Sequence, residues 1–234
     1  MAAPSISIPV IEAPAEERVE YLKKTGLYTA ISLTIAAFSA VFSTLFIAPV
    51  ITGRWTSLIV ILGSWGIAHY VAPRFVFGTA KQAGLVLASV FEGVAFGFLL
   101  LTALYVSAAA HGNEFVLIGQ AMAATALTAF GMVGYLWANP KDFSFIGAGL
   151  SMLGLPMLCL MGITFIFPIG GTLGLMIAAG FVVFSAAALL YSTNTVLHDL
   201  DTSMHIEGAY MISMALLTLL WNILVLLMRL TSRD

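Results

Sequence analysis

The sequence predicts an all-α integral membrane protein built as a seven-transmembrane-helix bundle, and three observations lead to this class. Hydrophobic residues make up 61% of the 234 residues and only 9% are charged, whereas a soluble domain carries roughly 25% charged residues. The mean hydropathy is +1.05. Apolar stretches long enough to cross a bilayer also recur along the chain, separated by short polar or Gly/Pro-containing breaks.

A membrane-spanning helix needs about 20 apolar residues. The predicted spans are residues 26–50, 55–72, 82–107, 115–138, 145–168, 170–194 and 209–230. Residues 1–25 are expected to be a cytoplasmic tail, disordered over its Pro- and Ala-rich first 13 residues, with a short juxtamembrane helix after them. Residues 26–234 are then a single membrane domain.

Lysine and arginine fix the expected orientation, because basic residues concentrate on the cytoplasmic side. With the N-terminus inside, six basic residues face the cytoplasm and three face outward. The inner set is Arg18, Lys23, Lys24, Arg74, Lys81 and Lys141, and the outer set is Arg54, Arg229 and Arg233. The C-terminus is therefore expected outside. The net charge of −2 gives no reason to expect a nucleic acid partner.

Sequence patterns typical of enzymes are missing. There is no HExxH metal motif and no Gly-x-Ser-x-Gly nucleophile elbow. The single cysteine, Cys159, cannot form an intrachain disulfide, and the last lysine is Lys141, which leaves none late in the chain for a retinal Schiff base. We therefore predict a protein that is not an enzyme, with no catalytic residues and no cofactor.

Glu92 is the strongest single-residue signal. It lies about ten residues into the third span, roughly 15 Å deep at 1.5 Å per residue. Ionisable residues at such depth are costly and usually functional. Glu92 is either protonated or facing a polar cavity or a partner, so a titrating site and a structural interhelical hydrogen bond both remain open. Gly93 and Gly97 form a GxxxG step that lets another helix approach closely.

The remaining polar residues favour structural readings. In the last span, Thr218 and Asn222 share one helix face and would join helices, while Arg229 is close enough to the span's end to reach the interface. His69 is either an interfacial histidine or a pH sensor. A group of five residues after the sixth span resembles a loose metal set, but its spacing matches no motif, and a solvated loop with no metal is expected. The group is His198, Asp199, Asp201, His205 and Glu207.

Four segments in order resemble the Bax inhibitor family and its bacterial YccA-like branch, over roughly residues 20–234. "WANPKDFSFIGAGL" (137–150) is similar to the family's loop signature, here Lys141, Asp142, Phe143 and Ser144. "FEGVAFG" contains the Glu-Gly of the third span. "YSTNTVLH" (191–198) lies where many members have Tyr-Asp-Thr-Gln, and "LLWNILVLLMRL" (219–230) resembles the last span.

The resemblance implies a seven-helix bundle with the last helix near its centre. Calcium-leak members use two aspartates that share a proton, but Ser192 and Leu219 occupy those positions here, so calcium transport is doubtful. The resemblance also places a polar network in the last two spans, Asn194, Thr218 and Asn222. It makes the end of the sixth span a cytoplasmic mouth, His198, Asp199 and Asp201.

Two functions follow as expectations. The YccA-like branch implies a regulatory protein of the bacterial inner membrane that binds and modulates the membrane-anchored AAA protease FtsH, with the lipid bilayer and such a protease as its partners. The alternative is a cation leak, for calcium or linked to protons, in which Glu92 is the titrating group although the usual aspartate pair is missing.

Overall fold

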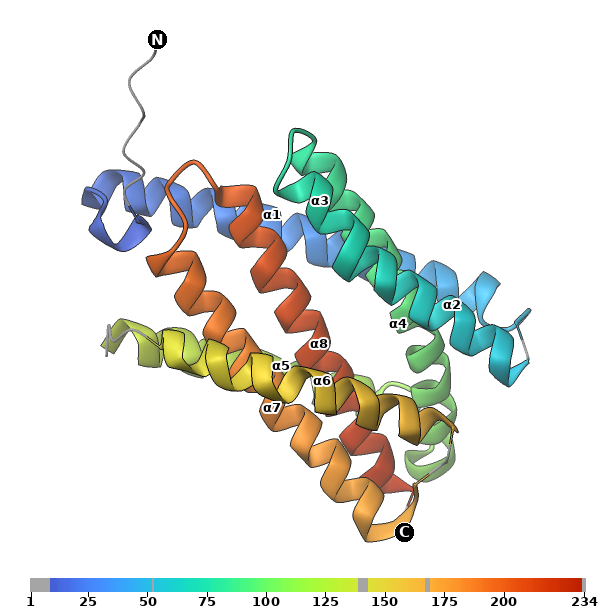
Figure 1. Cartoon of the computed structure of the whole chain (residues 1–234). Coiled ribbons are helices and arrows are strands. Elements are labelled where there is room, and N and C mark those ends of the chain that lie inside the picture. Colours follow the sequence, from blue (N-terminus) through green and yellow to red (C-terminus); the bar gives the residue numbers. More distant parts are fainter. Residues whose placement is uncertain (1–8, 52, 139–142, 167–168, 233–234) are drawn as a thin grey trace.

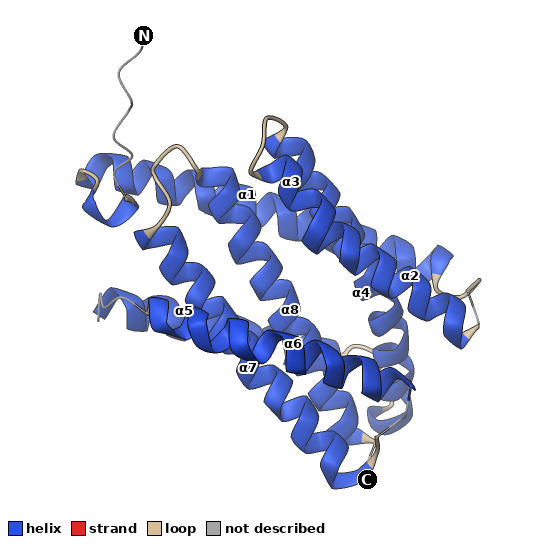
Figure 2. Cartoon of the chain, in the orientation of Figure 1, coloured by secondary structure: helices blue, strands red, loops and turns tan. Residues whose placement is uncertain are grey.

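The structure is a computed structural model that describes residues 9–51, 53–138, 143–166 and 169–232. Its regular structure there is helical (Figures 1 and 2). The elements are η1 (Val10–Glu12), α1 (Ala15–Phe42), η2 (Ser43–Ile47), α2 (Arg54–Gly66), η3 (Ile67–Val71), α3 (Ala72–Val76), α4 (Lys81–His111), α5 (Val116–Ala138), α6 (Ser144–Ile166), α7 (Gly171–His198) and α8 (His205–Thr231).

Six helical segments of the described chain are long and apolar enough to cross a membrane. They are Ala15–Ile47, Arg54–Val76, Lys81–His111, Val116–Leu136, Gly171–His198 and His205–Thr231. Within α6, residues Phe145–Gly154 form a shorter apolar helix. An all-helical membrane protein is therefore confirmed, and α6 lies where the fifth span was expected.

α8 occupies the middle of the bundle, where it contacts α1, α3, α4, α5 and α7 (Figure 1). The central place that the resemblance implied for the last helix is thus confirmed. Three serines join α8 to its neighbours: Ser32 of α1 bonds Ser89 of α4 at 2.8 Å and Ser213 of α8 at 2.9 Å. All three are buried, and such hydroxyl contacts hold helices together where no water competes.

The GxxxG step packs α4 against α1 and η2. A Cβ atom on Gly93 would overlap the carbonyl oxygen of Ala36, and one on Gly97 would overlap Ser43. Because glycine has no side chain, the backbones approach closely enough for the Ser43 hydroxyl to donate to the Val94 carbonyl at 2.8 Å. The expected close helix approach is therefore present, and it fixes the helix that carries Glu92.

The second predicted span ends later than expected. We placed a break at residues 73–81, but the helix continues through Pro73 to Val76. The π-helix η3 explains the difference: the Ala72 amide bonds the Ile67 carbonyl, so the ladder is already shifted where proline lacks its N–H. Pro73 then falls in the first turn of α3, a position that tolerates it.

The N-terminal segment packs against the loop between α7 and α8. The Val10 amide bonds the Leu200 carbonyl at 3.0 Å, and Pro9 forms a bridge with Asp201. Val10 is fully buried beside Tyr21 and Val196. Part of the stretch expected to be disordered is thus an ordered 3-10 helix, while residues 1–8 lie outside the described residues. The helix expected before the first span is continuous with it, because α1 begins at Ala15 and runs into the span Ala15–Ile47.

Candidate functional site

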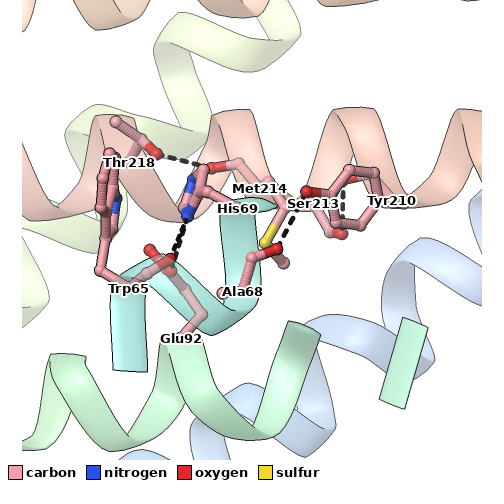
Figure 3. A network of polar contacts seen from close by, with 8 residues as sticks. All are labelled: Trp65, Ala68, His69, Glu92, Tyr210, Ser213, Met214 and Thr218. Atoms are coloured by element: carbon pink, nitrogen blue, oxygen red, sulfur yellow. Dashed lines mark hydrogen bonds and ion pairs between the residues drawn. The ribbon is translucent and has the colours of Figure 1, made fainter. Parts of the chain in front are cut away.

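Glu92 lies on α4 with its side chain inside the bundle and only 4% of the residue exposed. His69 of η3 approaches it, with Nδ1 3.5 Å from Glu92 Oε2 (Figure 3). The same Nδ1 lies 3.1 Å from the Trp65 carbonyl oxygen, and the imidazole stacks on the Trp65 ring at 4.7 Å. Because Nδ1 carries at most one hydrogen, and the backbone carbonyl is the nearer acceptor, Glu92 Oε2 remains without a hydrogen bond.

The π-helix that carries His69 is tied to the centre of the bundle by Tyr210. Its hydroxyl donates to the Ala68 carbonyl at 3.0 Å (Figure 3). In the π-helical pattern the partner of the Ala68 carbonyl would be the amide of Pro73, which has no hydrogen. Tyr210 therefore satisfies an acceptor that the helix itself leaves open, and it sets the position of His69 beside Glu92.

A cavity of about 380 Å³ opens next to this pair. Its walls come from α2, α4, α6, α7 and α8 and are mainly apolar and aromatic. The apolar side chains include Ile61, Leu62, Trp65, Phe181, Phe184 and Trp221. This volume lies in the range of small-molecule sites, roughly 300–1,000 Å³.

Polar groups enter the cavity along one face of α8. Thr218, Asn222 and Arg229 line it together with Glu92. Thr218 donates to the Met214 carbonyl at 2.9 Å. Arg229 donates to the carbonyl of Ile169, just before α7, at 2.8 Å. Eleven residues separate Thr218 from Arg229, about 16 Å along the helix.

Ser192 and Leu219, the positions that the resemblance assigns to an aspartate pair, differ in their surroundings. Leu219 is fully buried in an apolar cluster with Leu189, Ala215 and Ile223. Ser192 is half-buried on α7. No hydrogen bond joins the described side chains of Ser192 and Asn222. Neither position therefore contributes a carboxylate.

The predicted polar network divides into two parts. Thr218 and Asn222 line the cavity, whereas Asn194 is buried near the end of α7 and accepts a hydrogen bond from the Phe143 amide at 3.1 Å. Asn194 thus holds the chain where it enters α6. Of the loop signature, Lys141 and Asp142 lie outside the described residues, and Ser144 is the first residue of α6.

The expected cytoplasmic mouth lies at the end of α7. His198 is the last residue of the helix and its Nδ1 lies 3.1 Å from the Asn194 carbonyl. Asp199 follows at the helix end and is exposed. Asp201 accepts hydrogen bonds from the amide and hydroxyl of Ser203. Among the described residues, no group of three His, Cys, Asp or Glu side chains is arranged to hold a metal ion.

Glu207 was not predicted as a buried residue. We placed it in a solvated loop, but α8 begins at His205, so Glu207 belongs to its first turn and is 1% exposed. Its Oε1 lies 2.6 Å from Lys81 Nζ at the start of α4. One sequence signal was available, because Glu207, Tyr210, Met214 and Thr218 recur at helical spacing on one face.

Comparison with known proteins identifies the family of this chain. The family model described as "Inhibitor of apoptosis-promoting Bax1" matches residues 18–232. The chain belongs to the Bax inhibitor family. The resemblance that the four sequence segments indicate is therefore confirmed.

The individual relatives share low sequence identity with this chain or match only part of it. The Escherichia coli K12 protein named "Modulator of FtsH protease YccA" is 27% identical over 217 residues, 91% of each chain. An uncharacterised protein of Pseudomonas aeruginosa is 38% identical over 81 residues, 35% of this chain and 36% of the relative, so that match spans about a third of its length. Mouse protein lifeguard 4 is 28% identical over 55% of this chain and 54% of its own. No solved structure matches the chain.

Proposed function

We propose that this protein is a regulatory membrane protein that modulates an FtsH-type, membrane-anchored AAA protease. The observation that carries the proposal is the likeness to E. coli YccA, which extends over 91% of both chains. The polar groups of the cavity support a binding role over catalysis, because Glu92, Thr218 and Asn222 stand beside neither a nucleophile–base pair nor a metal cluster in the described residues.

The topology belongs to the same proposal. Six helices qualify as spans, and α6 extends over 23 residues, which at 1.5 Å per residue is about 34 Å and enough to cross the roughly 30 Å apolar core of a bilayer. We propose seven spans in a bacterial inner membrane, with the N-terminus in the cytoplasm by the distribution of basic residues. Residues 1–8 then precede the packed segment at Val10 on the side where a cytoplasmic unfoldase would engage them.

The test is the lifetime of the protein in cells with and without the protease. We expect deletion of residues 1–8 to lengthen the lifetime only where the protease is present, and to strengthen inhibition of a second protease substrate. A matched control replaces residues 1–8 by the same number of Gly and Ser residues, which keeps the reach of the tail and should preserve degradation. Equal lifetimes in both kinds of cell would contradict the proposal.

A cation leak is the second candidate, and one observation favours it: Glu92 faces a cavity inside the apolar part of the bundle. The two positions of the aspartate pair argue against calcium as the ion. A proton-linked pathway would need only the carboxyl of Glu92 and the neighbouring His69. Flux measurements in liposomes that contain only this protein distinguish the two candidates, because a protease modulator needs no flux.

A further inference from the structure

We propose that the cavity beside Glu92 binds a hydrophobic amine, a molecule with one amino group and a long apolar chain, that enters from the lipid between α2 and α6. The inference is independent of protease modulation. It rests on three features of the described residues: a buried carboxyl oxygen without a hydrogen-bond partner, the charge at each end of the cavity, and two wall helices without backbone contact.

The acceptor is the carboxyl of Glu92, which lines the cavity and whose Oε2 lies 3.5 Å from His69 Nδ1. The residue is 4% exposed, and this oxygen has no hydrogen-bond partner. A buried polar atom without a partner costs free energy that a ligand donor would recover. An amine N–H fits this need in either protonation state of the pair, because a proton shared between amine and carboxyl leaves a donor facing an acceptor.

The two ends of the cavity differ in charge. Glu92 and Thr218 lie at one end, and Arg229 lies about 16 Å along α8 at the other. The guanidinium of Arg229 repels a cationic group, so an amine is directed to Glu92. The walls between the ends are apolar and aromatic and suit an alkyl chain.

Two helices that line the cavity together have no backbone contact with each other. α2 contributes Ile61, Leu62 and Trp65, and α6 contributes Gly154 and Met157. In the described part of the chain no Cα atom of α2 lies within 8 Å of a Cα atom of α6. A chain longer than the cavity can therefore extend outward between them into the bilayer.

Two glycines of α6 provide a matched pair of variants. A Cβ atom on Gly154 or on Gly149 would meet no atom within 4 Å, so a larger side chain fits at both positions. Only Gly154 lines the cavity. Gly154→Phe is expected to fill the space that the ligand needs, whereas Gly149→Phe makes the same chemical change on the same helix and leaves the cavity unchanged.

The experiment measures quenching of tryptophan fluorescence in nanodiscs of phosphatidylcholine, a lipid without net charge. Trp65 and Trp221 lie in the cavity wall and report a bound heavy atom. The probes are dodecylamine, dodecanol and dodecanoic acid, each with bromine at mid-chain, so that only the head group differs. We expect quenching by the amine to saturate, and quenching by the acid to rise linearly as it partitions into the lipid.

The variants decide the proposal. We expect Glu92→Gln to raise the amine concentration at half-saturation about tenfold or more, which corresponds to the loss of one charge-assisted hydrogen bond. Gly154→Phe should raise this concentration by a similar factor, because its side chain fills the space that the ligand needs. Gly149→Phe should match the unaltered protein. If Glu92→Gln fails to fold, the two glycine variants decide alone.

Three outcomes would overturn the proposal. The first is amine quenching that does not saturate, or that is the same in Gly154→Phe and Gly149→Phe. The second is an alcohol that binds as tightly as the amine, which would remove the role of charge. The third is an acid that saturates in preference, which would assign the cavity to an anionic ligand of Arg229.

Discussion

Glu92 and Glu207 are the two buried carboxylates of the described chain, and their surroundings differ. Glu207 is 1% exposed and its Oε1 lies 2.6 Å from the ammonium of Lys81. Glu92 is 4% exposed, and its nearest ionisable neighbour is His69, at 3.5 Å. In both residues Oε2 has no hydrogen-bond partner, so the difference lies in the counter-charge. A buried carboxylate with an ammonium close by can be tolerated as structure, whereas a buried carboxyl without one has an unmet requirement.

The two residues also differ in what surrounds them. Glu207 lies in the first turn of α8, where a negative charge suits the helix dipole. At the neighbouring Gly208 a Cβ atom would meet the Tyr21 hydroxyl oxygen at 2.5 Å. Glu92 instead borders the cavity. We infer that Glu207 joins the first turns of α4 and α8 through Lys81, and that Glu92 is available to bind a ligand in the cavity.

Removing the counter-charge of Glu207 should give the largest effect. Lys81→Met leaves the carboxylate buried without its partner, which typically costs about 3–5 kcal/mol. Because Lys81 is 38% exposed, we expect a smaller loss, about 2–3 kcal/mol, in the free energy of unfolding measured in detergent.

The matched control is Lys24→Met. Lys24 pairs with Glu20 at 2.7 Å, but both side chains are more than half exposed, and exposed pairs contribute about 0–1 kcal/mol. Equal destabilisation by the two variants would show that Glu207 is no more dependent on its lysine than a surface residue is.

Glu92→Gln should change stability much less. The amide has nearly the same shape and keeps a donor and an acceptor, and the replaced oxygen makes no hydrogen bond in the structure. We expect a change within about 1 kcal/mol, smaller than that of Glu207→Gln, which removes the negative charge that pairs with Lys81. If Glu92→Gln unfolds as easily as Lys81→Met, Glu92 is a structural carboxyl, the alternative that its sequence position leaves open.

The sequence predicts that the carboxyl of Glu92 is buried, because a single acidic residue in the middle of an apolar span lies within the membrane. It does not predict the burial of Glu207, because the polar residues around the start of α8 make this segment look like a loop. Hydropathy does not distinguish a solvated turn from the first turn of a helix. The helical spacing of Glu207, Tyr210 and Met214 indicates a helix face, and the contact with Lys81, 126 positions away in sequence, shows that Glu207 on this face is paired inside the bundle.

The π-helix at Ile67–Val71 lies equally beyond sequence reasoning. Pro73 indicates a break, and a break was expected there. The helix continues because Tyr210, on a distant helix, bonds the carbonyl that the shift leaves open. Long apolar helices follow from local composition, whereas the geometry that places His69 beside Glu92 depends on tertiary contacts.

The smallest expected effect is the calcium flux of the unaltered protein, which should equal that of empty liposomes from about pH 6 to 8. Calcium takes 6–8 oxygen ligands, with carboxylates supplying the charge. The cavity offers one carboxyl, Glu92, together with Thr218 and Asn222. Leu219, at a family aspartate position, is fully buried among apolar residues, so Leu219→Asp would destabilise the bundle before it formed a site.

Thr218→Asp is the sharper variant, because Thr218 already lines the cavity with Glu92. It would place a second carboxylate on the same cavity, and two interacting carboxylates titrate as a coupled pair. We expect it to raise calcium flux above background and to make that flux depend on pH, while Thr218→Asn, of similar size without the charge, leaves it at background. A strong leak by the unaltered protein would contradict this expectation and would show that Glu92 alone is enough to pass the ion.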